Sequence, residues 1–262
     1  GIRDRLRSLG SEMCIRDSFG GDKQETMRLY EDILSDANRY GLQVIFHGCT
    51  IPRGWERMYP NYVGSEAVLA SENLYFEQKH CDLEGFELTM HPFSRNTIGS
   101  MDWGGVVMKH RMGRGTDNGN YRRTTDVFEM ATAITNQASM QCIAVQPDNI
   151  DGLPQFEKDF LKAVPTTWDE TRFIDGYPTK YVVIARRHGN DWYVGGLNGT
   201  DKSMTLTICL PMFTGQKVKI YADNEKKTGE ANATSALKSV KVGSKGMLKV
   251  TIQPLGGIIV TK

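Results

Sequence analysis

Two glutamates and a histidine in one stretch of the sequence could carry acid–base chemistry. His47 follows a short apolar run, and Glu66 and Glu72 come after it in one glycine-containing segment. A carboxyl group whose surroundings raise its pKa can protonate a leaving oxygen and then activate a water molecule. Carboxylate oxygens also suit calcium. Paired loop glutamates are most often solvated surface residues, so the pair alone does not decide between a site and a surface.

The segment 49–77, which contains both glutamates, is long for a connection inside a compact domain. A loop of this length is either functional or disordered, and a high aromatic content argues against disorder. Its aromatic residues are Trp55, Tyr59, Tyr62, Tyr75 and Phe76. We therefore expect a functional loop whose aromatic side chains form a lid over the site.

The residues before His47 indicate a helix and a buried strand that position it. Asp22 and Glu25 form a capping-box pattern at the expected start of the helix, and Gly41 is expected to end it. One face of this helix is apolar and consists of Met27, Tyr30, Ile33, Leu34 and Ala37. The apolar run 42–46 then predicts a buried strand of an α/β fold. His47 follows its carboxyl end, the edge where parallel sheets bind ligands.

Further elements of the same kind follow along the chain. The run 97–102 predicts a strand that ends in a carboxylate, Asp102, and the polar, glycine-rich segment 108–121 is typical of a loop. Residues 124–138 predict a helix whose apolar face consists of Val127, Met130, Ala131 and Ile134.

From about residue 180 the sequence alternates in the manner of β-strands. Glycine, asparagine and aspartate separate the strands at short intervals, as in an antiparallel sandwich or barrel. The expected strands are 181–185, 192–194, 204–208, 217–221, 247–252 and 257–260. The change of pattern places a domain boundary at about residues 160–168.

The composition excludes several classes of protein. The net charge is +1 and no long basic run interrupts the balance, so neither nucleic acid nor an anionic membrane is an expected partner. No apolar run approaches the ~20 residues that span a bilayer. The five cysteines are scattered and form no C-x-x-C pair, which argues against zinc and against a dense disulfide framework.

Residues 1–16 show neither strand alternation nor a convincing amphipathic stripe, and no apolar segment of a signal peptide follows their basic residues. The string SEMCIRDS at 11–18 resembles translated sequencing-adapter read-through at the edge of a metagenomic contig. We expect residues 1–16 to be artefactual and the natural N-terminus to lie upstream. A genuine basic N-terminal helix is the alternative.

Several motifs occur together around the two glutamates and beyond them. After His47 come P-x-G at 52–54, R-x-Y-P-N at 57–61 and E-x-x-x-x-x-E at 66–72. Further along are G-S-M-D at 99–102, V-P-T-T-W-D-E at 164–170, A-R-R at 185–187 and W-Y-V-G-G at 192–196. The combination resembles glycoside hydrolase family 97 from about residue 17 to the end, although no single motif would be specific.

The resemblance implies a fold and a domain plan. Residues 17–163 would form the second half of a catalytic (β/α)8 TIM barrel, and residues 164–262 an all-β antiparallel sandwich domain linked with oligomerisation. The expected fold class is therefore an α/β partial barrel followed by an all-β domain. Because a half barrel has unpaired strand edges, we expect the 262-residue chain to be inactive alone.

The resemblance also implies roles for individual residues. Glu72 takes the acid/base position, and Glu66 takes a calcium-ligand position with Glu72 as a second ligand of Ca²⁺. His47 would contact the sugar in the −1 subsite. Asp102 is a candidate ligand for a sugar hydroxyl.

One position distinguishes the inverting from the retaining members of the family. Inverting members carry a base glutamate directly after the strand-end histidine, where this sequence has Gly48. Retaining members use an aspartate ahead of a Phe-Gly segment, and Asp17 takes the matching place. Its neighbours Arg16 and Ser18 are polar where a barrel strand is apolar, so a chance match stays open. Asp17 is the expected nucleophile.

The expected function is a retaining α-glycosidase, with α-galactosidase favoured, that removes terminal α-linked sugars from an oligo- or polysaccharide. An α-glucosidase of the same family is the alternative within the class. A non-catalytic carbohydrate-binding module, or a homo-oligomerisation module acting through the C-terminal domain, is the alternative outside it. Because family members are commonly exported by bacteria, we expect a periplasmic or secreted location.

Overall fold

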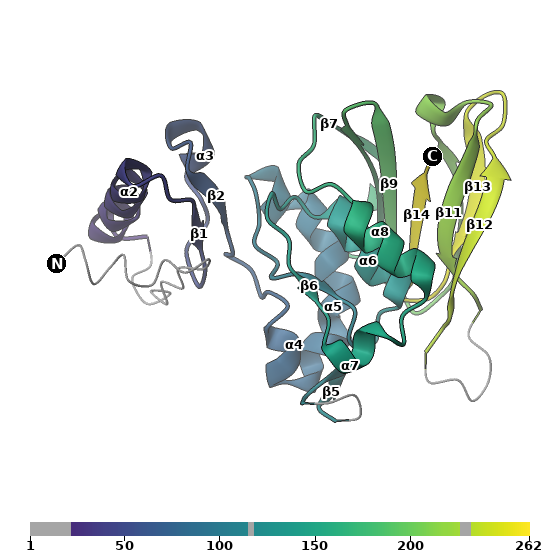
Figure 1. Cartoon of the computed structure of the whole chain (residues 1–262), viewed down its shortest axis with the longest axis horizontal. Coiled ribbons are helices and arrows are strands. Elements are labelled where there is room, and N and C mark those ends of the chain that lie inside the picture. Colours follow the sequence, from purple (N-terminus) through teal and green to yellow (C-terminus); the bar gives the residue numbers. More distant parts are fainter. Residues whose placement is uncertain (1–21, 115–117, 226–231) are drawn as a thin grey trace.

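The computed structural model describes residues 22–114, 118–225 and 232–262. The segment 1–16 and the expected nucleophile Asp17 therefore lie outside the described residues. Along the chain a small helix–strand unit comes first, then a group of helices, and then a large antiparallel sheet (Figure 1). None of the described helices is both long enough and apolar enough to cross a membrane.

The first described helix, α2 (Gln24–Arg39), has the expected apolar face but a different start. Its buried residues are Tyr30, Ile33, Leu34 and Ala37. The N-cap is Lys23, which makes no side-chain cap hydrogen bond, so the expected capping box is wrong. Asp22 instead pairs with Arg53 at 2.6 Å and accepts a hydrogen bond from Thr50, because the loop after His47 returns to this end of the helix.

The helix ends at a glycine, as predicted. Gly41 has φ +66, a region that residues with a Cβ rarely adopt. Its N–H donates to the Asn38 carbonyl at 3.1 Å, and the Leu42 N–H donates to the Ala37 carbonyl at 3.0 Å. This pair of bonds is a Schellman motif, and it turns the chain directly into strand β1 (Val44–Phe46).

Parallel pairing begins at β1, which pairs with β2 (Tyr62–Ser65). The segment expected to be one loop thus contains β2 and the short helices α3 (Trp55–Met58) and α4 (Asn73–Phe76). The expected strand 97–102 does not form, because η2 (Arg95–Thr97) occupies its start and only Met101 pairs, in a parallel bridge with Ser65. A second parallel pair joins β3 (Val106–Val107) to β6 (Ile143–Ala144).

The remaining elements of the middle part are mostly helices. The helix expected at 124–138 is α6 (Asp126–Thr135), and Thr125 caps it by accepting a hydrogen bond from the Phe128 N–H. The others are α5 (Gln78–Met90), η1 (His91–Phe93), the pair β4 (Arg111–Met112) and β5 (Asn120–Tyr121), α7 (Pro147–Ile150) and α8 (Gln155–Ala163).

The C-terminal part contains the expected antiparallel strands. A six-stranded sheet has the order β12-β11-β14-β9-β8-β7, and β10 pairs with β13 in a separate ribbon. Two strands, β7 and β12, were not predicted. The bounds are β7 Glu170–Tyr177, β8 Tyr181–His188, β9 Asp191–Asn198, β10 Met204–Cys209, β11 Lys217–Asp223, β12 Ser235–Lys241, β13 Met247–Ile252 and β14 Gly257–Thr261, with η3 (Pro211–Phe213) after β10.

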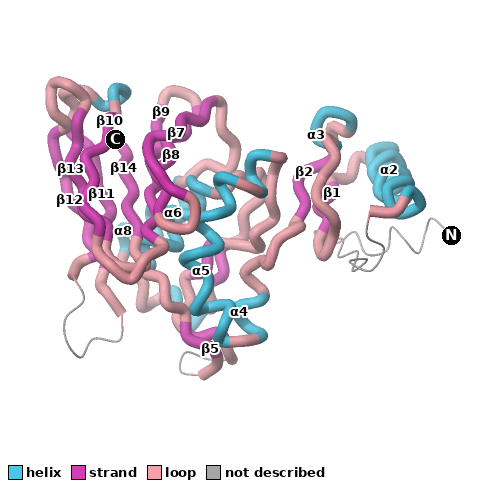
Figure 2. The backbone as a smooth tube through the Cα atoms, turned by 180° about the vertical axis from the view of Figure 1, so that it is seen from behind, coloured by secondary structure: helices cyan, strands magenta, loops and turns pink. Residues whose placement is uncertain are grey.

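The six-stranded sheet has an apolar core on each face. The β10–β13 ribbon covers one face, and α6 packs on the other (Figures 1 and 2). Glycines permit the close approach of α6. A Cβ on Gly257 would lie 2.4 Å from the Val127 carbonyl oxygen, and a Cβ on Gly195 would lie 2.9 Å from the Ile134 Cβ. Helices, sheet and ribbon therefore form three layers.

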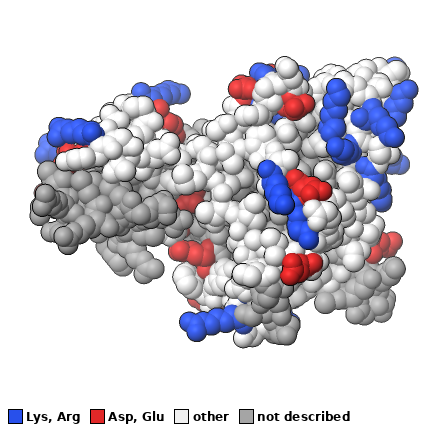
Figure 3. Space-filling model, in the orientation of Figure 1, with Lys and Arg blue, Asp and Glu red and all other residues white. Residues whose placement is uncertain are grey.

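Basic side chains gather over this sheet on the face shown in Figure 3. Exposed lysines occur at alternate positions of β11 and on β12, and they are Lys217, Lys219, Lys238 and Lys241. Acidic side chains are scattered over the rest of that face (Figure 3).

Candidate active site

Three of the predicted site residues follow the ends of two neighbouring parallel strands and of the bridge beside them. The Glu66 N–H donates to the Phe46 carbonyl at 2.8 Å, and the Asp102 N–H donates to the Ser65 carbonyl at 2.9 Å. His47, Glu66 and Asp102 each come directly after the last paired residue of their own segment. Since the segments run parallel, their carboxyl ends meet at one edge, and the three side chains meet there.

The imidazole of His47 lies among three carboxylates. Its Nε2 is 3.0 Å from Glu72 Oε2, and its Nδ1 is 3.6 Å from Glu66 Oε2 and 3.5 Å from Asp102 Oδ2. Glu72 reaches the group from the start of α4. The structure thus brings together every predicted site residue that it describes.

The two glutamates differ in their access to solvent. The Glu66 side chain is 6% exposed and that of Glu72 is 45% exposed. Burial raises the pKa of Glu66, although a hydrogen bond from the Gly48 N–H and the charge of His47 oppose the rise. A substrate can therefore reach Glu72, whereas Glu66 is enclosed beneath it.

Gly48 takes a conformation that explains its residue type. Its φ is +61, and its N–H donates to Glu66 Oε2. A residue with a Cβ is strained in this region, so a glutamate at this position would disturb the bond that holds Glu66. The backbone here favours a glycine over the base glutamate of inverting members.

The pKa of His47 depends on its three carboxylate neighbours. Burial on its own would lower the pKa of His47, but the charges of Glu66, Glu72 and Asp102 outweigh it and raise the pKa above its ordinary value. A neutral imidazole donates from one nitrogen, whereas the protonated ring donates from both. The carboxylates on both sides therefore favour the protonated form.

The aromatic residues of the loop do not all form the expected lid. Trp55 and Tyr62 are buried with Tyr30 and Phe46, and the Trp55 ring centroid lies 5.0 Å from that of Tyr30 and 5.6 Å from that of Phe46. They brace β1 against α2, because a bulky apolar surface gains more from burial in this core than from covering a polar site. The prediction of an aromatic lid is therefore wrong for Trp55 and Tyr62.

This group of residues could bind a cation. The ligand atoms of His47, Glu66 and Glu72 all lie within 4.8 Å of one another. Three carboxylates around one imidazole leave an excess of negative charge, and the two glutamates supply oxygens of the kind that calcium takes. The imidazole nitrogen suits calcium poorly, so the glutamates fit this ion and His47 does not.

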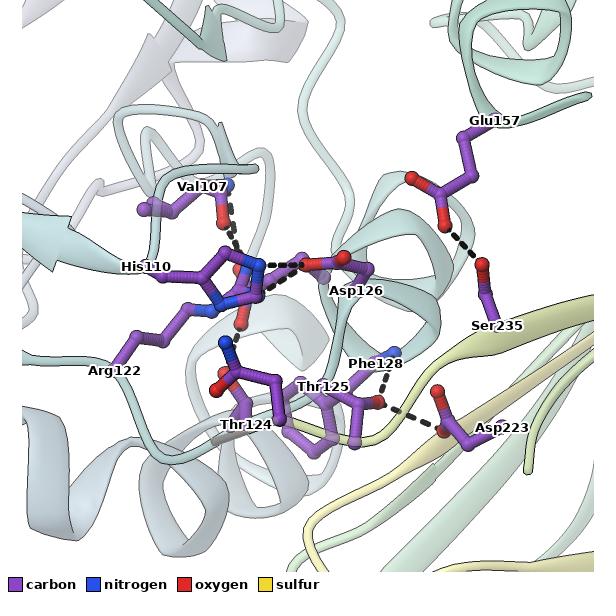
Figure 4. Close-up of polar contacts among 12 residues, drawn as sticks. Val107, His110, Arg122, Thr124, Thr125, Asp126, Phe128, Glu157, Asp223 and Ser235 are labelled. Atoms are coloured by element: carbon purple, nitrogen blue, oxygen red, sulfur yellow. Dashed lines mark hydrogen bonds and ion pairs between the residues drawn. The ribbon is translucent and has the colours of Figure 1, made fainter. Parts of the chain in front are cut away.

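A second group of titratable residues lies between α6 and the C-terminal sheet (Figure 4). The Asp223 carboxylate accepts hydrogen bonds from the Thr125 hydroxyl at 2.8 Å and the Gly257 N–H at 2.9 Å, and burial raises its pKa to about 7. Burial also raises the pKa of Glu157, which pairs with Ser235, to about 7. These contacts join the helices to the sheet, and nothing in the sequence pattern had singled them out.

Arg122 and Asp126 belong to the same buried group (Figure 4). They form an ion pair, and Asp126 is also 3.2 Å from His110 Nε2. Burial opposes the ionisation of Asp126, but Arg122 and His110 prevail and lower its pKa to about 2. The pair fixes the first turn of α6 and lies apart from the His47 group.

Two family profiles match the sequence, one in its first part and one in its last part. "Glycoside hydrolase 97" matches residues 2–68, which include β1, β2, His47 and Glu66. "Glycosyl-hydrolase 97 C-terminal, oligomerisation" matches residues 167–261, which include the whole six-stranded sheet. The chain belongs to glycoside hydrolase family 97. The first match begins at residue 2 and so includes most of the segment 1–16.

Two curated relatives of this family 97 chain carry names of one activity. The "Probable retaining alpha-galactosidase" of Streptomyces bingchenggensis is 33% identical over 180 residues, which are 69% of this chain and 26% of that protein. The "Retaining alpha-galactosidase" of Bacteroides thetaiotaomicron is 28% identical over 230 residues, which are 84% of this chain and 33% of that protein. The chain thus spans a quarter to a third of their length.

Similar solved structures include one named for a different activity and one named as a family 97 enzyme. A β-arabinopyranosidase is 55% identical and superposes with a TM-score of 0.87 over 92% of this chain and 38% of that one. A family 97 enzyme from Pseudoalteromonas sp. strain K8, solved with panose, is 23% identical with a TM-score of 0.73, over 88% of this chain and 36% of that one. The second likeness concerns the fold alone.

Proposed function

We propose that this family 97 chain carries the acid/base side of a retaining glycosidase site. The observation that supports it most is the position of Glu72, a half-exposed carboxylate that lies 3.0 Å from His47 Nε2 at the carboxyl edge of parallel strands. The succession of β1, β2 and the Met101 bridge also supports a (β/α)8 barrel as the frame of the site.

The proposed chemistry uses Glu72 twice. Its carboxyl group first donates a proton to the glycosidic oxygen as that oxygen's bond to the anomeric carbon breaks and the carboxylate of the nucleophile bonds to the same carbon. The resulting carboxylate then takes a proton from the water that displaces the sugar from the enzyme. Gly48 offers no carboxylate to activate water from the opposite face, which favours retention. Asp17, the proposed nucleophile, lies outside the described residues.

His47 is proposed to hydrogen-bond the Glu72 carboxylate and to contact the sugar. Its Nε2 faces Glu72, while Glu66 and Asp102 hold the other ring nitrogen. A ring oriented in this way can donate to the Glu72 carboxylate after proton transfer and so stabilise it. Asp102, half-buried beside the ring, is placed to accept a hydrogen bond from a sugar hydroxyl.

Calcium is the proposed cofactor, held by Glu66 and Glu72. A divalent cation would neutralise part of the excess negative charge of the group and act as a Lewis acid toward oxygen. The two carboxylates supply part of the six to eight oxygens that calcium takes, so other groups or waters must complete the set.

The proposed substrate is a terminal pyranoside of galacto configuration. Relatives of this chain are named for α-galactosides and for β-arabinopyranosides. β-L-Arabinopyranose has the ring configuration of α-D-galactopyranose and lacks only the hydroxymethyl group at C5. One site can therefore accept both rings, with the space around C5 deciding the preference.

Release of nitrophenol tests this proposal. The substrates are the 4-nitrophenyl α-galactoside, β-L-arabinopyranoside and α-glucoside, and the proteins are this chain and a graft of residues 22–262 onto the preceding part of the β-arabinopyranosidase. We expect the graft to hydrolyse the first two and not the third. Selective hydrolysis of the α-glucoside would contradict the galacto configuration and identify an α-glucosidase instead. No hydrolysis of any of them, with sugar binding retained, would favour a non-catalytic binding module.

A further inference from the structure

Arg95 is a buried arginine that the proposed chemistry does not use. It begins η2 and is 5% exposed. Among the described residues no carboxylate forms an ion pair with it, and burial lowers its pKa. Placing a guanidinium inside a protein is costly unless its donors are satisfied. The partners of this side chain therefore indicate what it is for.

Among the described residues, its hydrogen-bond partners are all backbone carbonyl oxygens. Arg95 Nη2 donates to Ser65 at 2.8 Å and to Ser100 at 2.9 Å, Nη1 donates to Gly99 at 3.1 Å, and Nε donates to Glu66 at 3.3 Å. A guanidinium offers five N–H donors in a rigid plane. One side chain thus binds four carbonyls at once.

These carbonyls belong to the two segments that carry the acids of the site. Ser65 ends β2 and Glu66 follows it directly, while Gly99 and Ser100 precede Met101 and Asp102. The two segments share a single bridge, between Ser65 and Met101. Where a longer strand pair would hold them together, the guanidinium does so instead.

We infer that Arg95 is a positioning residue that sets the spacing of Glu66 and Asp102 on either side of His47 by joining the two backbone segments that carry them. Both acids face the same ring nitrogen, at 3.6 and 3.5 Å. A shift of either segment changes the orientation of the ring that faces Glu72. The consequence for catalysis rests on the proposed function, whereas the effect on the backbone does not.

Amide hydrogen exchange of the full chain tests the inference directly. The variants are Arg95→Met, which keeps an unbranched apolar stem and removes every donor, and Arg95→Lys, which keeps three donors. Arg186→Met is the matched control, because Arg186 is 4% exposed and its Nη2 binds one carbonyl, that of Thr135, at 3.4 Å. We expect the Glu66 and Asp102 amides to exchange about ten-fold faster in Arg95→Met.

The comparison of variants separates positioning from general stability. Arg95→Lys should show a smaller increase at the same two amides, and Arg186→Met should show none there. An equal increase across α6 and the sheet in Arg95→Met, or no increase at Glu66 and Asp102, would overturn the inference. Should Arg95→Met fail to fold, Arg95→Lys decides by the same criterion.

A kinetic measurement in the graft extends the test to the proposed reaction. Arg95→Lys should lower kcat about ten-fold or more and leave KM within about two-fold, because the site loses alignment rather than substrate contacts. An unchanged kcat would contradict the positioning role. An inactive parent graft would count against the proposed function, and the exchange result would then decide the role of Arg95 by itself.

Discussion

His47 and Glu72 face one another at 3.0 Å across the edge of the parallel strands, although 25 residues separate them in the sequence. The loop between them returns to the same edge because β2 pairs with β1 in parallel and delivers its end beside His47. The buried Glu66 lies behind the imidazole and the accessible Glu72 in front of it. An enclosed acid, a ring and an exposed acid thus form one line of contacts.

Substitution of the enclosed acid should weaken cation binding and leave the fold intact. In Glu66→Gln the amide keeps an oxygen for the Gly48 N–H but loses the negative charge. We expect calcium affinity, measured by calorimetry or terbium luminescence in the full chain, to fall about ten-fold or more. Glu77→Gln, an exposed loop glutamate paired with Lys79, should bind as the parent does. Equal affinity of Glu66→Gln and the parent would remove Glu66 from the ligand set.

The free energy of unfolding should fall as the pH rises from about 4 to about 7, because of Asp223. Its pKa in the folded state is about 7, well above that of an unfolded aspartate, so the folded chain holds a proton that the unfolded chain has lost. The contribution of Asp223 to the free energy of unfolding is therefore fully present below about pH 4 and is lost progressively up to about pH 7, by up to about 4 kcal/mol. Urea unfolding at pH 5 and at pH 8 covers the upper part of this window and should show a loss of about 3 kcal/mol.

Asp223→Asn should flatten this dependence, since the amide does not ionise. Part of the slope should persist, because Glu157 also has a raised pKa of about 7 and acts in the same direction. Asp191→Asn, at an exposed position of β9, is the control. A pH slope in Asp223→Asn as steep as in the control would show that Asp223 is not the group responsible.

Gly257→Ala should loosen the contact between α6 and the sheet. The added Cβ would lie 2.4 Å from the Val127 carbonyl oxygen and 2.5 Å from the Phe128 nitrogen. Both are backbone atoms, which cannot rotate away, so we expect a loss of about 1–3 kcal/mol in the free energy of unfolding. In Gly152→Ala the new atom meets only the Asn149 carbonyl oxygen at 3.6 Å. Similar stability of the two variants would contradict this account of the packing.

Local patterns in the sequence predicted the elements with strong periodicity. The apolar face of α2, its end at Gly41 and the strand after it follow from side-chain spacing and from the residue type that adopts a positive φ most readily. The strands β8–β11, β13 and β14 follow from alternation. The polar edge strands β7 and β12 have too few apolar residues to be recognised in the sequence, because they become strands only by pairing with a neighbour.

The errors concern segments whose structure depends on side-chain contacts that a local hydrophobic pattern does not reveal. The run 97–102 has the composition of a strand, yet Arg95 takes the carbonyls of Gly99 and Ser100 and replaces most of the pairing. Trp55 and Tyr62 were predicted to cover the site, but they pack in the core that α2 forms with β1. Family motifs relate residues that are far apart in the sequence, and they allowed the prediction of His47, Glu66, Glu72 and Asp102. Arg95 and Asp223 belong to none of these motifs.

Removal of the Glu72 carboxyl group in the active graft is the most direct measurement of the central claim. Glu72→Ala should slow hydrolysis of a galactoside with a poor leaving group by about 10²–10⁴-fold, without a loss of thermal stability, because the side chain is 45% exposed. Azide, which needs no base, should restore turnover of an activated substrate and give a glycosyl azide of retained configuration. Glu77→Ala should leave the rate unchanged. A Glu72→Ala variant as active as Glu77→Ala, or an azide product of inverted configuration, would contradict the account.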